Sequence, residues 1–351
     1  MRKILTFVFG MLGFNALCAC VNSNFENREA EAFAQLLKQK DVILLDVRTP
    51  EEYAEGHIPG AVNIDVKQDN FMEQVGRLLD KSKTIATYCR SGRRSANAAD
   101  MMSQKGYKPV NLKGGIMAWK SAGMPVDNVE VDAFMTPGGK TVVFCALMHA
   151  CIRIWFDGTE IEIDPVRKLR ERTVDYSPYP KADYILVTHE HGDHFDKEAI
   201  KMLSADSTQV VTNKRCADML GYGTVMANGD QRDADGIFHI EAVPAYNNTE
   251  GHLQFHPKGR DNGYVISLDG LRVYVAGDTE DIDEMAGIKD IDIAFLPCNQ
   301  PYTMTTDQLV RAARMVKPKV LFPYHYGDTK LDGIGQQLQN DGIEVRIRHY
   351  E

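Results

Sequence analysis

The 351-residue sequence has little that would mark a disulfide-stabilised, fibrous or disordered protein. Its seven cysteines are few for this length and show no paired spacing, which excludes a disulfide scaffold. There is no internal repeat, and an apolar content of 44% with 25% charged residues is typical of globular chains. The 49 acidic residues outnumber the 40 basic ones, and the resulting formal net charge of −9 argues against nucleic acid as a partner.

The first twenty residues predict a targeting signal rather than a structural element. A short positively charged start precedes the apolar run Ile4–Leu17, which is too short to span a bilayer comfortably but has the length of a signal peptide. The run ends in a segment that resembles the lipobox of bacterial lipoproteins, with Cys20 as the lipidated residue. Residues 21–27 then predict a polar tether, so we expect a lipid-anchored protein of the cell envelope, on the periplasmic side of a bacterial membrane.

The remaining chain is too long for one ordinary hydrophobic core and fits two domains. In the first, residues 28–127, strands alternate with helices, which predicts an α/β fold with a parallel sheet covered by helices. The predicted strands are 42–45, 61–64, 84–88 and 110–112, and the predicted helices are 30–37, 71–79 and 95–104.

A loop centred on Cys89 lies between a predicted strand and a predicted helix. Its sequence is Cys89-Arg90-Ser91-Gly92-Arg93-Arg94-Ser95. At such a place successive backbone N–H groups point toward one spot near the positive end of a helix, and the arginines add charge. We therefore expect a lowered thiol pKa and a site for an anionic sulfur species.

Motifs around this loop resemble a single-domain rhodanese. They are DVRTPEEY at 46–53, GHIPGA at 56–61, the Cys89 loop, and GGI at 114–116 with Trp119. The resemblance implies that Cys89 carries a transferable sulfane sulfur as a persulfide, that a sulfane-sulfur donor is a partner, and that His57 shapes a turn. A cysteine phosphatase is the rival interpretation, but such enzymes place arginine six positions after the cysteine, where this chain has Ser95.

Residues 128–137 predict a linker, and residues 138–351 a second domain. Strands are predicted at 141–149, 152–156, 159–163, 184–188, 210–212, 264–268, 272–276 and 293–296, and helices at 197–203, 217–220 and 306–316. Two packed sheets flanked by helices, an αββα sandwich, fit this order.

The segment His189-Glu190-His191-Gly192-Asp193-His194 directly follows a predicted strand. Three histidines and a carboxylate on a tight turn supply the nitrogen and oxygen ligands that zinc, iron or manganese accept. Histidines at this density predict a metal site.

This motif and its surroundings resemble a metallo-β-lactamase fold. Supporting segments are 149–151 leading to 163–165, then 276–279 and 323–327. The resemblance implies two divalent metal ions, with zinc favoured over manganese or iron. It assigns His189 and His191 to the first metal, Asp278 to a bridging position, and to the second metal Asp193 (which also has a catalytic role), His194 and His325. Asp164 is expected to orient the ring of His189 or His191 without binding the metal itself.

The first metal site departs from the family pattern. Members of this fold usually supply a further histidine where this chain has Asn247, and asparagine is a poor zinc ligand. His256 lies close enough in sequence for a loop to return it to the site, and we expect it to complete the metal ligands, with Asn247 behind it.

The motifs near Asn247, Asp278 and Tyr302 resemble the ascorbate-phosphate-lactonase-like branch. We therefore expect a hydrolase of esters, lactones or phosphodiesters with a small-molecule substrate. An anionic substrate would suit Lys258 and Arg260. Two alternatives stay open: a persulfide dioxygenase with mononuclear iron, and a non-enzymatic persulfide-binding module whose metal site has degraded.

Other side chains are assigned by their neighbours. Tyr302, Thr303 and Tyr326 are expected to line the substrate cleft. The cysteines outside the loop are expected to be small buried hydrophobes, with the last of them nearest the pocket; they are Cys145, Cys151, Cys216 and Cys298.

Overall fold

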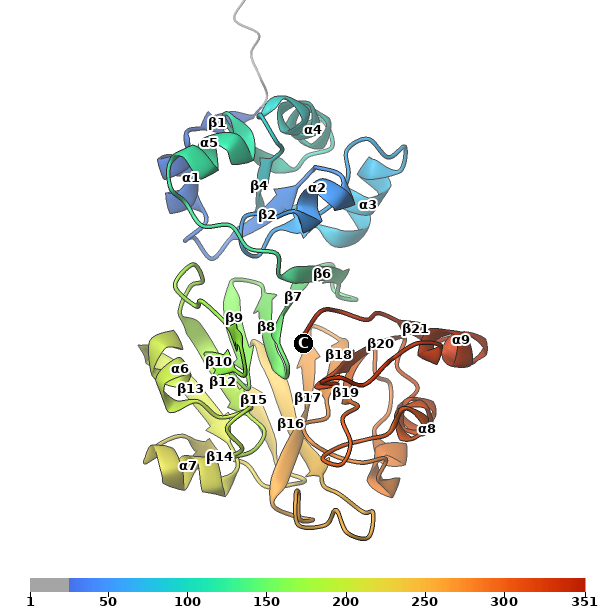
Figure 1. Ribbon diagram of the computed structural model, residues 1–351. Coiled ribbons are helices and arrows are strands. Elements are labelled where there is room, and N and C mark those ends of the chain that lie inside the picture. The colour runs from blue at the N-terminus through green and yellow to red at the C-terminus, as the bar shows by residue number, and fades with distance from the viewer. Residues whose placement is uncertain (1–24, 351) are drawn as a thin grey trace, which may run out of the picture.

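The computed structural model describes residues 25–350. The predicted signal peptide, the predicted lipidation site Cys20 and the start of the tether lie outside the described residues. Among the described helices, none combines the length and apolar character needed to cross a membrane. The chain forms two domains, and strand β6 begins the second one where they meet (Figure 1).

Five parallel strands form the sheet of the first domain, in the order β1-β5-β4-β2-β3. They are β1 (Glu26–Arg28), β2 (Val42–Asp46), β3 (Val62–Asn63), β4 (Thr84–Tyr88) and β5 (Lys108–Leu112). This confirms the predicted α/β fold. Glu26 and Asn27, which were predicted as tether, instead pair with β5, because the edge of a parallel sheet leaves backbone groups that a further strand satisfies.

Successive apolar residues of β2 point to opposite faces of this sheet. Leu44 packs in the core with α1 (Ala30–Leu36) and α5 (Gly115–Ser121). Ile43 and Leu45 pack in the core with α3 (Phe71–Leu78) and α4 (Arg93–Ser103). Burial on both faces explains why the strand reads as a continuous apolar run. The short helix α2 (Pro50–Ala54) is closed by a Thr49–Glu52 capping box.

Two seven-stranded sheets form the second domain and pack face to face, as the predicted αββα sandwich requires (Figure 1). The first has the order β14-β13-β12-β9-β8-β7-β6, and the second β15-β16-β17-β18-β19-β20-β21. The first contains β6 (Glu130–Met135), β7 (Thr141–Met148), β8 (Cys151–Phe156), β9 (Thr159–Ile163), β12 (Ala182–Val187), β13 (Ser204–Thr212) and β14 (Thr224–Val225). The second contains β15 (Gln231–Ala234), β16 (Phe238–Ala245), β17 (Asp261–Leu268), β18 (Leu271–Val275), β19 (Ile293–Pro297), β20 (Val320–Tyr324) and β21 (Glu344–Val345).

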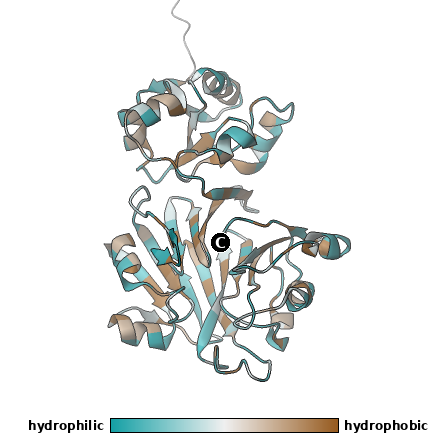
Figure 2. Ribbon diagram, in the orientation of Figure 1, coloured by the Kyte–Doolittle hydropathy of each residue, from teal (hydrophilic) through white to brown (hydrophobic). Residues whose placement is uncertain are grey.

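Helices cover the outer faces of both sheets. Apolar side chains of α6 (Lys197–Leu203) and α7 (Lys214–Leu220) belong to the core outside the first sheet, and those of α8 (Thr306–Val316) and α9 (Ile334–Leu338) to the core outside the second. Figure 2 shows the apolar residues gathered on the strands between these layers. A small hairpin, β10 (Lys168–Leu169) and β11 (Arg172–Thr173), lies outside both sheets.

The segment 128–137 is not a linker. It contains β6, which pairs antiparallel with β7 along six residues and extends the first sheet. Glu130 and Asp132 alternate with Val131 and Ala133, as in a half-buried strand, so the sequence carries a strand signal here, although Phe134 and Met135 interrupt it. One core therefore runs through both domains, joining Val75 of α3 to Val143 and Cys145 of β7.

Polar contacts between the domains come from the amino ends of the first domain's strands. Lys83, before β4, pairs with Asp157 at 2.5 Å, and Lys40, before β2, pairs with Asp183 at 2.8 Å. The buried hydroxyl of Thr141 donates to the carbonyl of Leu78 at 2.7 Å. These contacts fix the start of β7, the β8–β9 turn and the start of β12 against the first domain.

Candidate functional site

The candidate metal ligands, including one that the sequence did not assign, follow the ends of strands that belong to both sheets. His149 comes after β7, His189 after β12, Asp278 after β18 and His325 after β20. Strands β7, β9 and β12 run parallel, so their carboxyl ends meet at one edge, opposite the end that contacts the first domain. Backbone strain marks this edge, because His149 (φ 53°) and His325 (φ 48°) are both in the left-handed region.

The first group of ligands is His189, His191, His256 and Asp278, whose donor atoms all lie within 4.8 Å of one another. The loop after β16 returns His256 to the site, as the sequence suggested for the departure at Asn247. The rings of His191 and His256 are 4.9 Å apart between centroids. This group contains three imidazoles and one carboxylate, a donor set that suits zinc, iron or manganese.

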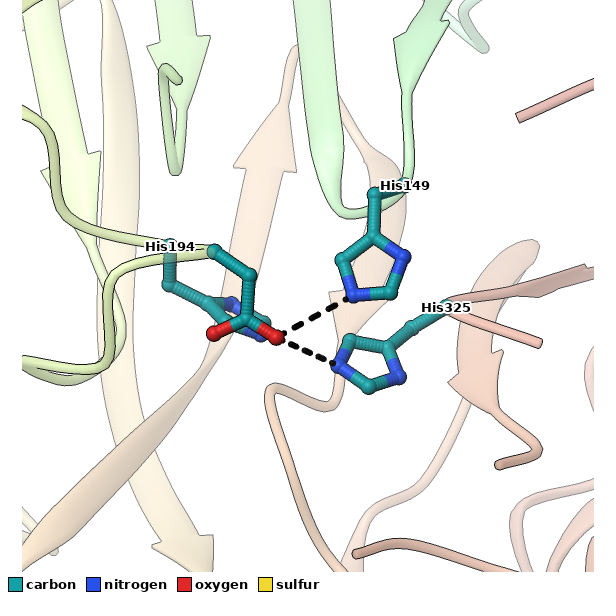
Figure 3. Close-up of side chains that lie close together, drawn as sticks. His149, His194 and His325 are labelled. Atoms are coloured by element: carbon teal, nitrogen blue, oxygen red, sulfur yellow. Dashed lines mark ion pairs between the residues drawn. The ribbon is translucent and has the colours of Figure 1, made fainter. Parts of the chain in front are cut away.

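The second group is His149, Asp193, His194 and His325, again within 4.8 Å (Figure 3). The Asp193 carboxylate lies 3.4 Å from His149 Nε2 and 3.6 Å from His325 Nε2. His149 was quoted from the sequence only as part of a supporting segment, not as a ligand. The signal that could have found it is a histidine at the end of a strand predicted to run parallel to the one before His189.

Asp278 lies between the two groups, as expected of a bridging carboxylate. Its Oδ1 is 3.2 Å from His194 Nε2, and its Oδ2 is 3.3 Å from both His256 Nε2 and His325 Nε2. The side chain is almost fully buried. Although burial alone would raise the pKa of Asp278, the surrounding histidines hold it well below its usual range, so the carboxylate stays ionised.

Asn247 lies behind His256 and not in the ligand group. Its Oδ1 accepts a hydrogen bond from His256 Nδ1 at 2.7 Å, and its Nδ2 donates to the carbonyl of Tyr302 at 2.9 Å. Held this way at Nδ1, the ring of His256 directs its Nε2 at Asp278.

Asp164 lies behind His194 rather than behind His189 or His191, which corrects the sequence-based expectation. Its Oδ2 is 2.8 Å from His194 Nδ1 and accepts from the Thr188 hydroxyl at 2.7 Å. That hydroxyl is in turn 3.0 Å from His189 Nδ1. Asp164 therefore reaches His189 only through the Thr188 hydroxyl.

The buried ring nitrogens of this site fit a metal better than they fit one another. His189 Nε2 is buried and has no hydrogen-bond partner among the described residues, and Asp278 Oδ2 is 3.8 Å away. Burial and the neighbouring His194 lower the pKa of His189 well below its usual value. A neutral imidazole whose buried Nε2 has no hydrogen-bond partner in the described part of the chain has the state that metal coordination requires.

The two cations that would suit an anionic substrate pair with carboxylates instead. Lys258 pairs with Glu284 at 2.7 Å, and Arg260 pairs with Asp261 at 2.7 Å, so neither cation is held toward the ligand groups as a dedicated anion site.

Thr303 is buried, and its hydroxyl accepts a hydrogen bond from the backbone N–H of Asn299, which corrects its assignment to the cleft. Tyr302 is 46% exposed and packs against Phe255, next to His256.

The Cys89 loop has the geometry of an anion site in the first domain. The sulfur accepts hydrogen bonds from the backbone N–H of Gly92 at 3.2 Å and the hydroxyl of Ser95 at 3.4 Å. Burial alone would raise the pKa of Cys89, but the hydrogen bonds from Ser95, Ser91 and Gly92 outweigh it, so the thiol pKa lies below its ordinary value.

One arginine of this loop forms an ion pair, and the other two are exposed to solvent. Arg94 makes two hydrogen bonds of 2.7 Å to Glu52 and lowers the pKa of that carboxyl to about 2, whereas Arg90 and Arg93 are exposed. His57 is buried, and its ring stacks on the ring of Tyr53 with the centroids 3.7 Å apart. Its Nε2 lies 3.2 Å from the carboxylate of Asp127, and both contacts fit the turn-shaping role expected of His57.

The other described cysteines are buried, as expected, and none is disulfide-bonded. Burial raises the pKa of Cys216 and of Cys298 to about 12. Burial raises the pKa of Cys145 and of Cys151 further still. Among the described cysteines, Cys89 is the one whose pKa is lowered.

Comparisons with known proteins divide the chain in the same place. A rhodanese-like domain model matches residues 29–122, and a beta-lactamase superfamily domain model matches residues 144–325. A UPF0173 metal-dependent hydrolase of Thermococcus kodakarensis is 31% identical over 190 residues, covering 51% of this chain and 82% of the relative. A relative of the same description from Archaeoglobus fulgidus is 32% identical, covering 48% of this chain and 78% of its own length.

Solved structures give the same fold for the second domain. A candidate metal-dependent hydrolase from Parabacteroides distasonis is 49% identical and superposes with a TM-score of 0.61, covering 64% of this chain and all of that one. A metallo hydrolase from Ignicoccus hospitalis, 24% identical with a TM-score of 0.50, covers 62% of this chain and 95% of its own and shares the fold.

Proposed function

Because the chain belongs to the metal-dependent hydrolases of the beta-lactamase superfamily, with a rhodanese-like domain ahead of that fold, we propose that it hydrolyses an ester, lactone or phosphodiester bond at a binuclear metal site. The observation that carries the proposal is the pair of four-residue ligand groups, of which the first contains Asp278, whose oxygens lie 3.2 Å from His194 and 3.3 Å from His325 of the second. When bound, two divalent ions would lower the pKa of a water molecule and polarise a substrate oxygen.

The chain's own side chains prepare this site. Asp164 and Asn247 each hold the Nδ1 of a ligand histidine, so that the Nε2 of His194 and of His256 face Asp278. Asp193 is the more exposed of the two carboxylates in the ligand groups, with 33% of its side chain accessible, and its contacts with His149 and His325 lower its pKa, so it stays an ionised ligand. Tyr302 and Phe255 border the first group and would contact the substrate's non-reacting part.

The nitrogen-rich ligand set favours zinc, with manganese or iron as alternatives, over calcium or magnesium, which prefer oxygen ligands. The two complete groups also favour a binuclear hydrolase over a mononuclear iron dioxygenase. The alternative of a degraded, non-enzymatic site rested on Asn247, and the position of His256 removes its basis.

For the first domain we propose a sulfur-carrier role, with Cys89 as the persulfide-bearing residue. The lowered thiol pKa and the converging N–H groups of its loop support this role, because both stabilise a sulfur anion. The described contacts of the loop come from its own domain, so we propose that the sulfur donor and acceptor reach Cys89 from solution.

The test is hydrolysis of an aryl ester, a lactone and an aryl phosphodiester by metal-depleted protein reloaded with zinc or manganese. Variants His189→Ala and His239→Ala form a matched pair, since His239 lies on β16 outside both ligand groups. We expect at least one substrate to be turned over, with the activity lost on chelation and in His189→Ala but kept in His239→Ala. Oxygen uptake with a persulfide by iron-loaded protein, without hydrolysis, would support the dioxygenase instead.

A further inference from the structure

Residues 346–350, named here the 346–350 strap, run back from β21 to the metal-site edge. The backbone N–H of His149 donates to the carbonyl of Tyr350 at 2.7 Å, and Tyr350 is 1% exposed in the core between the two sheets. The Tyr326 hydroxyl donates to the carbonyl of Arg348 at 2.6 Å. The strap is thus attached at two points to loops that carry ligands of the second group.

The left-handed backbone of His149 needs such support. A non-glycine residue in this region stores on the order of 1 kcal/mol or more of strain and persists only where its surroundings impose it. Here the N–H is held by Tyr350, and the carbonyl accepts from the backbone N–H of His325 at 3.2 Å. Losing the Tyr350 carbonyl would free His149 to relax and swing its imidazole away from Asp193.

Strand β6 holds the strap in place from the other side. Asp132 accepts hydrogen bonds from Arg348 at 2.7 and 2.8 Å and from Arg346 at 2.8 Å, and the carboxylate is only 8% exposed. Glu130, on the same strand, accepts from the backbone of His349 at 2.5 Å. Because β6 also packs against α3 of the first domain, this chain of contacts leads from the domain junction to a metal ligand.

We propose that the 346–350 strap, held by Asp132, positions His149, so that β6 at the domain junction sets the affinity of the second ligand group for its metal. The inference rests on the proposed binuclear site. Asp132 and Tyr350 are positioning residues, since they act through His149 and touch neither substrate nor metal. Groups that orient a ligand from behind typically change metal affinity by roughly 10- to 100-fold when removed.

The experiment is a titration of metal-free protein with Zn²⁺ in the presence of a competing chelator, repeated with Co²⁺ to follow the visible spectrum. Asp132→Ala is compared with Glu344→Ala, which removes the exposed partner of the same Arg346 and changes the charge equally. In Asp132→Ala we expect the second metal equivalent to bind roughly 10- to 100-fold more weakly, with an altered Co²⁺ spectrum and an unchanged first equivalent. Glu344→Ala should match the parent protein.

If Asp132→Ala fails to fold, judged by the unfolding midpoint of the metal-free protein, a chain ending at His349 removes the Tyr350 carbonyl directly. Parent-like affinity for both metals in a folded variant would overturn the strap's role while leaving the proposed function intact. A parent protein that takes up no second metal would overturn both.

Discussion

At the scale of single residues, His256 decides whether the first ligand group has three imidazoles or two. It occupies the position that Asn247 leaves unfilled, and Asn247 holds its Nδ1. We expect His256→Ala to retain one metal ion fewer per chain against a chelator, because two imidazoles and a shared carboxylate bind zinc weakly. Elemental analysis after dialysis measures this loss.

The control for that variant is His252→Ala. His252 lies on the same loop but pairs with Glu280 at 3.1 Å, outside both ligand groups. The His252→Ala variant should retain the metal content of the parent protein. Equal metal content in both variants would show that His256 is not a ligand.

Ser95 is the residue that most directly sets the charge state of Cys89. Its hydroxyl and its backbone N–H both stabilise the thiolate, so they lower the thiol pKa. Ser95→Ala keeps the N–H but loses the hydroxyl, and the titration midpoint should move up by about 1 to 2 pH units, since a hydrogen bond to a charged group contributes roughly 1.5–3 kcal/mol. Thiolate absorbance, taken as the difference from Cys89→Ser, follows the midpoint; an unchanged or lower midpoint would contradict this account.

At the scale of elements, the start of α5 closes the Cys89 loop by close backbone contact. A Cβ on Gly115 would lie 2.3 Å from the carbonyl oxygen of Cys89, which must move to admit it. Gly115→Ala should therefore lower the urea midpoint, with a loss of roughly 2 kcal/mol or more beyond the strain of its positive φ. It should also raise the Cys89 pKa, because the displaced loop no longer directs its N–H groups at the sulfur.

Gly123→Ala is the matched control, since Gly123 also has a positive φ (70°) but a Cβ there would meet nothing within 4 Å. It should lose only about 1 kcal/mol. If the two variants are equally stable, the close approach at Gly115 is not a packing constraint.

The sequence predicts the central elements of both domains and misses those at the edges. Strand β4 and helices α6 and α8 have the predicted bounds, because each combines a clear period with a capping residue or a turn. The linker predicted at 128–137 is wrong, because the short alternation from Glu130 to Ala133 belongs to strand β6, whose Asp132 carboxylate is buried against Arg346 and Arg348 from the far end of the chain. Partners that distant in sequence leave no local signal.

The metal site was predictable to the same extent. The dense motif 189–194 and the motifs around Asp278 and His325 identify most ligands, because their spacing is itself chemical information. His149 was missed as a ligand because it is a single histidine whose role depends on which strand ends meet. Asp164 was placed behind the wrong histidine for the same reason, since the sequence does not show which ring its carboxylate faces.

At the scale of the whole molecule, the two sites lie at strand ends that point away from the domain contacts. Cys89 follows the carboxyl end of β4, whereas Lys83 before β4 contacts the second domain. His189 follows the end of β12, whose start carries Asp183, the partner of Lys40 in the first domain. We therefore expect Cys89→Ser to leave kcat and KM for hydrolysis within twofold of the parent protein. A loss of tenfold or more would mean that the persulfide takes part in the reaction of the metal site.

The central claim is that the second domain binds two metal ions, one in each ligand group, with Asp278 of the first group in contact with the second. Metal analysis of purified residues 25–351, with the element and its amount per chain, tests it most directly. The account predicts two ions per chain, of zinc or manganese or both, falling to one in His256→Ala. A single iron per chain, or no retained metal at all, would contradict it.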